Sequence, residues 1–149
     1  MAQATTVRYG SQQLLIGDGA TPEVFTAPCG ITSLTKTTNV ETSNVNIPDC
    51  DDPDLASWLS IDEVSRQIQM SFGGVLATEA LTTVWQDWDM DGGYKNVRWY
   101  RDLTAPNGGG YLQGSALLTA FEESGEARGR YSISGTIIFD GKPTWTAAV

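Results

Sequence analysis

The stretch "SRQIQMSFGGVL", residues 65–76, carries the clearest structural signal in the sequence. Ile68, Met70 and Phe72 alternate with polar residues, and a period-two pattern of this kind is typical of a β-strand. The alternation predicts one face buried in a core and one face in contact with water. Such a strand needs a neighbouring strand to satisfy its backbone hydrogen-bonding groups.

The expected neighbour is "ITSLTKTTNVETSNVNI", residues 31–47. This segment is rich in β-branched residues and almost wholly polar, which predicts a long strand with little core contact. A strand of this kind left unpaired would promote aggregation, so we expect it to pair with residues 65–76. We expect Lys36 to point away from the polar face of the pair, although a register error of one residue would reverse its direction.

A long loop, at about residues 41–64, is predicted between these two strands. It contains an acidic run followed by large apolar residues, namely Leu55, Trp58, Leu59 and Ile61. Loops of this length are uncommon in compact domains and usually serve a function. Two interpretations remain open here: the apolar residues fold back onto their own domain as a helical turn, or they dock on another subunit.

Residues 78–88, "TEALTTVWQDW", predict a helix. Thr78 is a suitable N-cap and Glu79 complements the helix dipole at its start. One apolar stripe at helical spacing is formed by Leu81, Val84, Trp85 and Trp88. The stripe favours packing of both tryptophans against the core over a ligand-binding platform.

The segment "QDWDMDGGYK", residues 86–95, begins like the loop of a calcium-binding EF-hand. That motif requires a bidentate Glu at loop position twelve, which counted from Asp87 is Arg98. Position nine is Lys95, and a strand pattern follows where the exiting helix should begin. A solvated helix end with a turn is therefore favoured over a calcium site.

Other segments carry strand patterns separated by glycine-rich or proline-containing turns: residues 12–19, 23–27, 95–103, 111–124 and 127–141. The first two are expected to form a small hairpin. Together the segments predict a mainly β protein, an antiparallel sandwich or partial barrel with one flanking helix. At 149 residues the chain has the size of a single domain, residues 1–149.

Composition argues against several functions. The formal net charge of −9 opposes binding to nucleic acid or anionic lipid, and no apolar run approaches the length of a membrane span. The absence of histidine excludes Ser-His-Asp and Cys-His catalysis and the usual nitrogen ligand for zinc. The densest acidic cluster comprises Asp49, Asp51, Asp52 and Asp54. Pro48 precedes it and Pro53 lies within it, which suits an exposed loop and not a catalytic pair. Cys29 and Cys50 are expected to be reduced thiols, and no enzyme activity, metal or cofactor is predicted.

Several longer phrases resemble the major tail tube proteins of long-tailed, siphophage-type bacteriophages. They are "LLIGDGATPEVFTAPCGITSLTKTTN", the strand ending in "GGVL" before the single helix, and "ARGRYSISGTIIFDGKPTWT". The resemblance covers nearly the whole chain and contains no catalytic signature. It implies a β-sandwich or partial barrel with a flanking helix, whose inner sheets join into one barrel in a ring of six subunits. Stacked rings would then form the hollow virion tail tube through which DNA is delivered.

The resemblance also implies roles for particular residues. The face expected to line the lumen comprises Thr35, Thr37, Asn39, Glu41, Gln67, Gln69 and Ser71. The loop residues expected to hold rings together are Leu55, Trp58 and Leu59. Six subunits would carry 6 × −9 = −54 charges, so the genomic DNA is expected to pass without specific binding.

The expected partners are other copies of the chain and, by the same resemblance, the tape measure protein and tail-end proteins. Assembly is expected in the host cytoplasm, without a membrane. Two alternatives remain at this point: a carbohydrate-binding β-sandwich, suggested by five Trp and five Tyr, and a tail-completion or neck protein of the same fold that does not polymerise.

Overall fold

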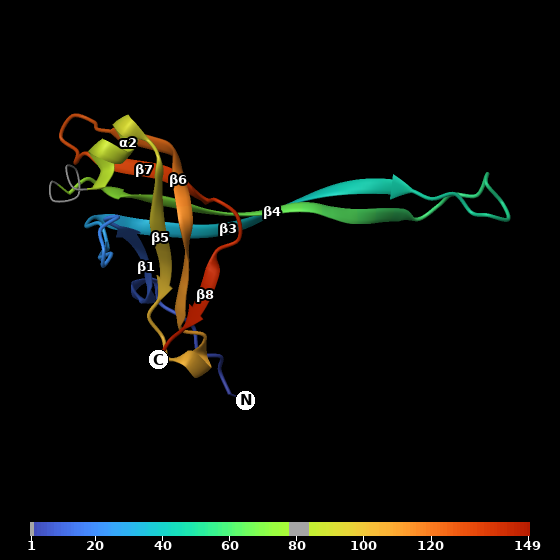
Figure 1. Ribbon diagram of the computed structural model, residues 1–149, viewed down its shortest axis with the longest axis horizontal. Helices are drawn as coiled ribbons and strands as arrows, with labels where there is room; N and C mark the ends of the chain where they lie inside the picture. Colours follow the sequence, from blue (N-terminus) through green and yellow to red (C-terminus); the bar gives the residue numbers. More distant parts are fainter. Residues whose placement is uncertain (1, 78–83) are drawn as a thin grey trace.

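A computed structural model describes residues 2–77 and 84–149 of the chain (Figure 1). The strands are β1 (Gln12–Gly17), β2 (Phe25–Thr26), β3 (Ile31–Asn46), β4 (Leu59–Val75), β5 (Tyr94–Arg101), β6 (Gly110–Ser124), β7 (Ser132–Phe139) and β8 (Thr144–Ala147). Short helical elements are α2 (Gln86–Asp91) and the 3-10 turns η1 (Tyr9–Ser11) and η3 (Ala105–Asn107).

All eight strands belong to one antiparallel sheet with the order β2-β1-β5-β6-β7-β4-β3, and β8 pairs with β6. Strand β6 joins the two halves of the sheet, because residues 110–117 pair with β5 and residues 116–124 pair with β7. The sheet coils until its ends approach each other, and the Gln12 side chain donates a hydrogen bond to the Leu34 carbonyl (3.1 Å). The sheet does not close within one copy. The predicted mainly β, antiparallel partial barrel with one flanking helix is confirmed.

The core lies on the concave side of this coiled sheet. Strands β1, β4, β5 and β7 each contribute buried residues at alternate positions; examples are Leu14, Met70, Val97 and Ile137. Met70 and Phe72 are buried, whereas Gln67 on the other face of β4 is exposed, so the alternation in residues 65–76 corresponds to the observed faces. Apolar burial on one face is the main force holding the coil together.

Trp85 and Trp88 close one end of this core. Val84 and Trp85 lie in a π-helical turn that leads into α2, and all three side chains are buried. The Trp85 ring stacks on Phe72, with centroids 4.7 Å apart, and on Phe121 at 5.4 Å. Leu81 and the expected start signals Thr78 and Glu79 lie outside the described residues.

The helix continues to Asp91, beyond the predicted end at residue 88. It ends there because Gly92 adopts a φ of 68°, which glycine tolerates, and its N–H donates to the Trp88 carbonyl (3.0 Å).

The predicted loop of residues 41–64 is too long. Strand β3 continues to Asn46 and β4 begins at Leu59, so the loop connecting them comprises residues 47–58. A β-ladder can extend beyond the core because its backbone hydrogen bonds need only the neighbouring strand. The short strand β8 had no clear signal in the sequence, since it has only four residues and follows Pro143.

Replacing Trp85 by alanine is expected to lower the free energy of unfolding by about 3–5 kcal/mol, because a fully buried aromatic side chain is lost. The matched control is Trp58→Ala, which removes a ring that is 94% exposed and should change stability by no more than about 0.5 kcal/mol. Urea unfolding of the unassembled protein, followed by circular dichroism, measures both. Equal losses for the two variants would contradict this account of the core.

Candidate assembly surfaces

The residues predicted to line a lumen lie together on one face of the β3–β4 ladder. The register pairs Thr35 with Ser71, Thr37 with Gln69, Asn39 with Gln67 and Glu41 with Ser65. Directly opposed residues in an antiparallel pair share a face, so all seven predicted residues are on the same side of the sheet. Lys36 points to the other side, where its ammonium group lies 4.7 Å from the centre of the Trp99 ring.

This polar face continues across β7 and β6. Ser71 is opposite Thr136, which in turn is opposite Ala120, and the next row brings Ser134 beside Glu122. The hydroxyl oxygens of Ser124 and Ser132 are 2.9 Å apart in the last row. Following the register through the described residues of β3, β4, β7 and β6, no lysine or arginine occupies this face. We call it the polar face.

Two sheet edges flank the polar face. Strand β3 is the last strand of the sheet, and its outer edge has no partner strand among the described residues. At the other side, the pairing of β6 with β5 stops at Leu117, so residues 118–124 of β6 have β7 on one side and no described strand on the other. Unpaired edges of this length readily add a strand from another chain.

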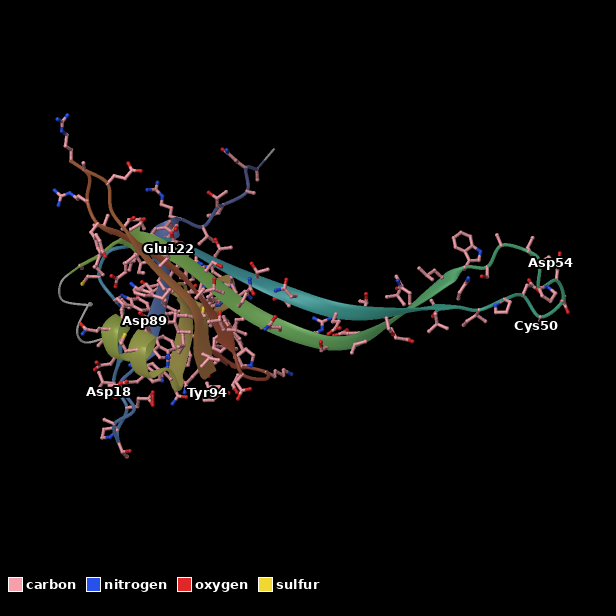
Figure 2. The ribbon with its side chains drawn as sticks, turned by 90° about the horizontal axis from the view of Figure 1, so that it is seen from above. Asp18, Cys50, Asp54, Asp89, Tyr94 and Glu122 are labelled. Atoms are coloured by element: carbon pink, nitrogen blue, oxygen red, sulfur yellow. The ribbon has the colours of Figure 1, made fainter. Side chains whose placement is uncertain are left out.

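The outer part of the β3–β4 ladder projects from the body as a hairpin (Figure 1). Pairing with β7 begins at Gln69, so residues 39–46 and 59–67 pair only with each other. At about 3.3 Å per residue, residues 39–46 alone extend roughly 26 Å beyond the body. Figure 2 shows Cys50 and Asp54 at its far end, remote from Asp89 on α2. The hairpin therefore does not fold back onto its own domain.

A register shift interrupts this ladder. Glu41 is opposite Ser65 but Thr42 is opposite Glu63, which leaves Val64 as an extra residue on β4. Such a bulge interrupts the alternation, so the residues of β4 before Val64 lie on the face opposite to the one that regular alternation from Ser65 would give. Glu63, Ile61 and Leu59 accordingly lie on the side opposite the polar face.

Large apolar side chains are exposed along the hairpin. Trp58 is 94% exposed, and Leu55 and Leu59 are more than half exposed, as are Ile47, Ile61 and Val64. These include the three residues predicted to hold rings together. A patch of this kind on an isolated chain marks a surface that another molecule covers.

The hairpin also carries most of the net charge. Residues 39–67, the hairpin with its loop, contain seven acidic residues and one arginine, Arg66, whereas the rest of the chain has eleven acidic and eight basic residues. Near the tip, Asp49 accepts hydrogen bonds from the backbone N–H of Asp51 (2.8 Å) and of Asp52 (3.3 Å). The aspartates thus shape an exposed turn and also concentrate negative charge there.

The described residues offer no cluster of metal ligands. They contain no group of three or more His, Cys, Asp or Glu side chains that could hold a metal ion, and Asp87, Asp89 and Asp91 lie along α2.

Backbone N–H groups of Ala20 and Val24 lower the pKa of Asp18, and the Arg66 side chain lowers the pKa of Glu63, both at exposed positions. Cys29 and Cys50 are free and exposed. Within residues 2–77 and 84–149, no helix is long and apolar enough to cross a membrane.

Comparison with known proteins points to one family. A family model described as "Phage tail tube protein" matches residues 10–145 of this chain. No curated protein matches the sequence.

Three solved structures share the fold. A chain from the virion of a native gene transfer agent particle has a TM-score of 0.75 at 16% identity, covering 95% of this chain and 100% of that one. A chain from the tail of an empty gene transfer agent particle with C6 symmetry gives 0.73 at 20% identity, with 95% and 100% coverage. A chain of the SPP1 tail tube gives 0.71 at 10% identity, with 97% and 81% coverage. Identities this low establish similarity of fold.

Proposed function

We propose, from the premise that this chain belongs to the phage tail tube protein family, that its copies form six-membered rings which stack into a hollow tube. Family membership makes the chain a structural protein of a virion tail and not an enzyme. It also favours a tube protein over the carbohydrate-binding and tail-completion alternatives. The six-fold ring, the lumen lining and the ring contacts are the parts that we propose here.

The proposed ring forms by pairing of the two free edges. Strands β6, β7, β4 and β3 alternate in direction, so the outer edge of β3 in one copy and residues 118–124 of β6 in the next copy would be antiparallel. Copies in a single orientation can therefore continue the sheet around a ring without a break. The C6 symmetry of the related gene transfer agent tail supports six copies, or 6 × 4 = 24 strands. Closure would remove both exposed edges.

The polar face would line the lumen, and its composition is the observation that carries this proposal. Hydroxyl, amide and carboxylate groups predominate on it, including Thr37, Gln67, Gln69 and Glu122. The apolar Ile138 and Leu117 lie in the row of Gln69, and no cation occupies the described part of the face. Cations on the wall would bind phosphates and release counterions, which would hold DNA in place. A wall without them lets the genome slide through.

The hairpin would join one ring to the next. It extends far beyond its own body and exposes Leu55, Trp58 and Leu59, which suit burial against a neighbouring copy. Contacts between successive rings are heterologous, and heterologous contacts that do not close produce a filament of open length. We further propose that the lumen encloses a tape measure protein during assembly in the host cytoplasm and that tail-end proteins terminate the tube.

Tubes assembled from the Gln67→Lys, Gln69→Lys variant are expected to form but to retain DNA. The two changes add 2 × 6 = 12 cations per proposed ring at exposed or half-exposed positions. Retention should fall steeply with salt, because each phosphate contact releases counterions. The measurement is DNA bound per tube at increasing salt, together with the rate of DNA release from particles built with the variant.

The matched control is Thr5→Lys with Thr6→Lys, which adds the same charge on the exposed N-terminal segment. Control tubes should retain far less DNA than the lumen variant. Equal retention, or release at the unmodified rate from the lumen variant, would contradict the assignment of the polar face to the lumen.

Trp58→Ala is expected to yield a folded subunit that does not lengthen into tubes, because the exposed ring contributes to ring contacts and not to the core. Negative-stain microscopy of the purified unmodified chain and the variant provides the measurement. The unmodified chain should form hollow tubes, and the variant single rings or separate subunits. Tubes of normal length from the variant would refute the hairpin assignment, and globular particles alone from the unmodified chain would refute the proposed function.

A further inference from the structure

A groove lies at the base of the hairpin, where the ladder leaves the body. Two adjoining hollows of about 470 and 520 Å³ share Ile68, Lys142 and Pro143. Arg66 borders one of them and Trp145 the other. We call these five residues the base groove.

The base groove is on the side of the sheet away from the polar face. Ile68 alternates with Gln67 and Gln69 along β4, and its opposite residue on β3 is Thr38, which also lines the groove. In the proposed ring this side faces away from the lumen. The groove is therefore accessible to a protein segment outside the channel and separate from the path of DNA.

The chemistry of the groove is apolar with a cationic rim. Trp145 is 43% exposed, and Ile68 is half-buried beside buried Pro143. The exposed Lys142 has no ion pair among the described residues, and Arg66 contacts Glu63 through its guanidinium group. A matching ligand combines carboxylates with large apolar side chains.

The hairpin tip has this combination. Asp51, Asp52 and Asp54 are followed directly by the exposed Leu55 and, three residues later, by the exposed Trp58. Opposite charges at the two surfaces and apolar groups in both make them complementary. The straight ladder holds the tip of one copy far from its own base groove (Figure 1), so only a second copy can supply it.

The length of the hairpin places the tip at the level of this groove in a neighbouring copy. Strand β7 runs along β4 in the body and has eight residues, or roughly 26 Å at 3.3 Å each. The projecting ladder is about as long, and the loop of residues 47–58 extends further. When bodies of the same orientation abut along the hairpin direction, the hairpin spans the neighbouring body and its tip reaches the region where that copy's own hairpin begins.

We propose that the hairpin tip of each copy docks in the base groove of a copy in the adjacent ring, with Asp51 and Asp52 beside Lys142, and Leu55 and Trp58 against Ile68 and Trp145. This inference rests on the proposed stacking of rings and names the receptor for the hairpin. Each copy both donates a tip and accepts one, so the contact repeats along the tube.

Cross-linking through the natural Cys50 tests the position of the tip. In a Cys29→Ser background Cys50 is the only cysteine, and Thr144→Cys places a second thiol on the rim of the groove while Lys142 is retained. A short bismaleimide added to assembled tubes should then join copies into a ladder of covalent oligomers. The matched control carries Asp89→Cys instead, an exposed position on α2 at the other end of the body (Figure 2).

The control tubes should give at least tenfold less cross-linked oligomer than the groove variant. Tubes that form but cross-link only through the Asp89→Cys position, or through neither position, would overturn the inference and leave the stacking of rings intact. Failure of the unmodified chain to form rings or tubes would overturn the proposed function and this inference together.

Charge reversal gives an independent test. Lys142→Glu should raise the protein concentration needed for tube assembly about fivefold or more, the order expected for the loss of one charge pair followed by repulsion. Arg128→Glu makes the same kind of change on the exposed turn before β7 and should have a smaller effect. Combining Lys142→Glu with Asp51→Lys should restore assembly, because opposite charges again meet at every junction. A double variant no better than Lys142→Glu alone would overturn the inference.

Discussion

The pairing of β3 with β4 is the constraint on which the remaining structure depends. Its inner half is a wall of the core, held by Leu34, Met70 and Phe72, while its outer half has only backbone hydrogen bonds and cross-strand side-chain pairs to hold it. Two-stranded ribbons are marginally stable in water. One continuous ladder thus joins a stable folded body to a hairpin of marginal stability.

The distribution of cations follows from the same architecture. Lys36 and Arg101 lie over Trp99, Lys95 lies over Trp88, and Arg98 lies over Phe25, so aromatic rings of the body bind much of the positive charge. Of these cations, Lys36 is on β3, and Lys95, Arg98 and Arg101 are on β5, where cation–aromatic contacts hold their side chains. No cation occupies the described part of the polar face, and the hairpin has Arg66 as its one cation against seven acidic residues, which gives the molecule a marked separation of charge.

Much of this fold could be predicted from the sequence, because a strand buried on one face alternates apolar and polar residues. The alternation around Met70 and Phe72 indicated strand β4, and the direction expected for Lys36 agrees with its contact to Trp99. The strand predicted over residues 31–47 agrees with β3. The outer part of β4 could not be predicted, because residues 59–67 bury no core and their composition also suits a loop. Burial of Val84, Trp85 and Trp88 follows the helical stripe. The sequence holds no sign of the base groove, whose five residues come from β4, β8 and the turn between β7 and β8.

The extra residue Val64 has a consequence for the tolerance of this protein to change. The pairing of β4 with β3 beyond Val64 determines the face on which Ile61 and Leu59 lie. With the bulge, both lie on the side opposite the polar face. Inserting one residue in β3 opposite Val64 would remove the bulge and turn Ile61 and Leu59 toward the polar face, whereas deleting Val64 would leave both on their observed side. The loop of residues 47–58 can vary in length without any such inversion. Natural variation in length should therefore be common in the loop of residues 47–58. It should be rare in the paired strands of the hairpin, where it would change the face on which side chains lie.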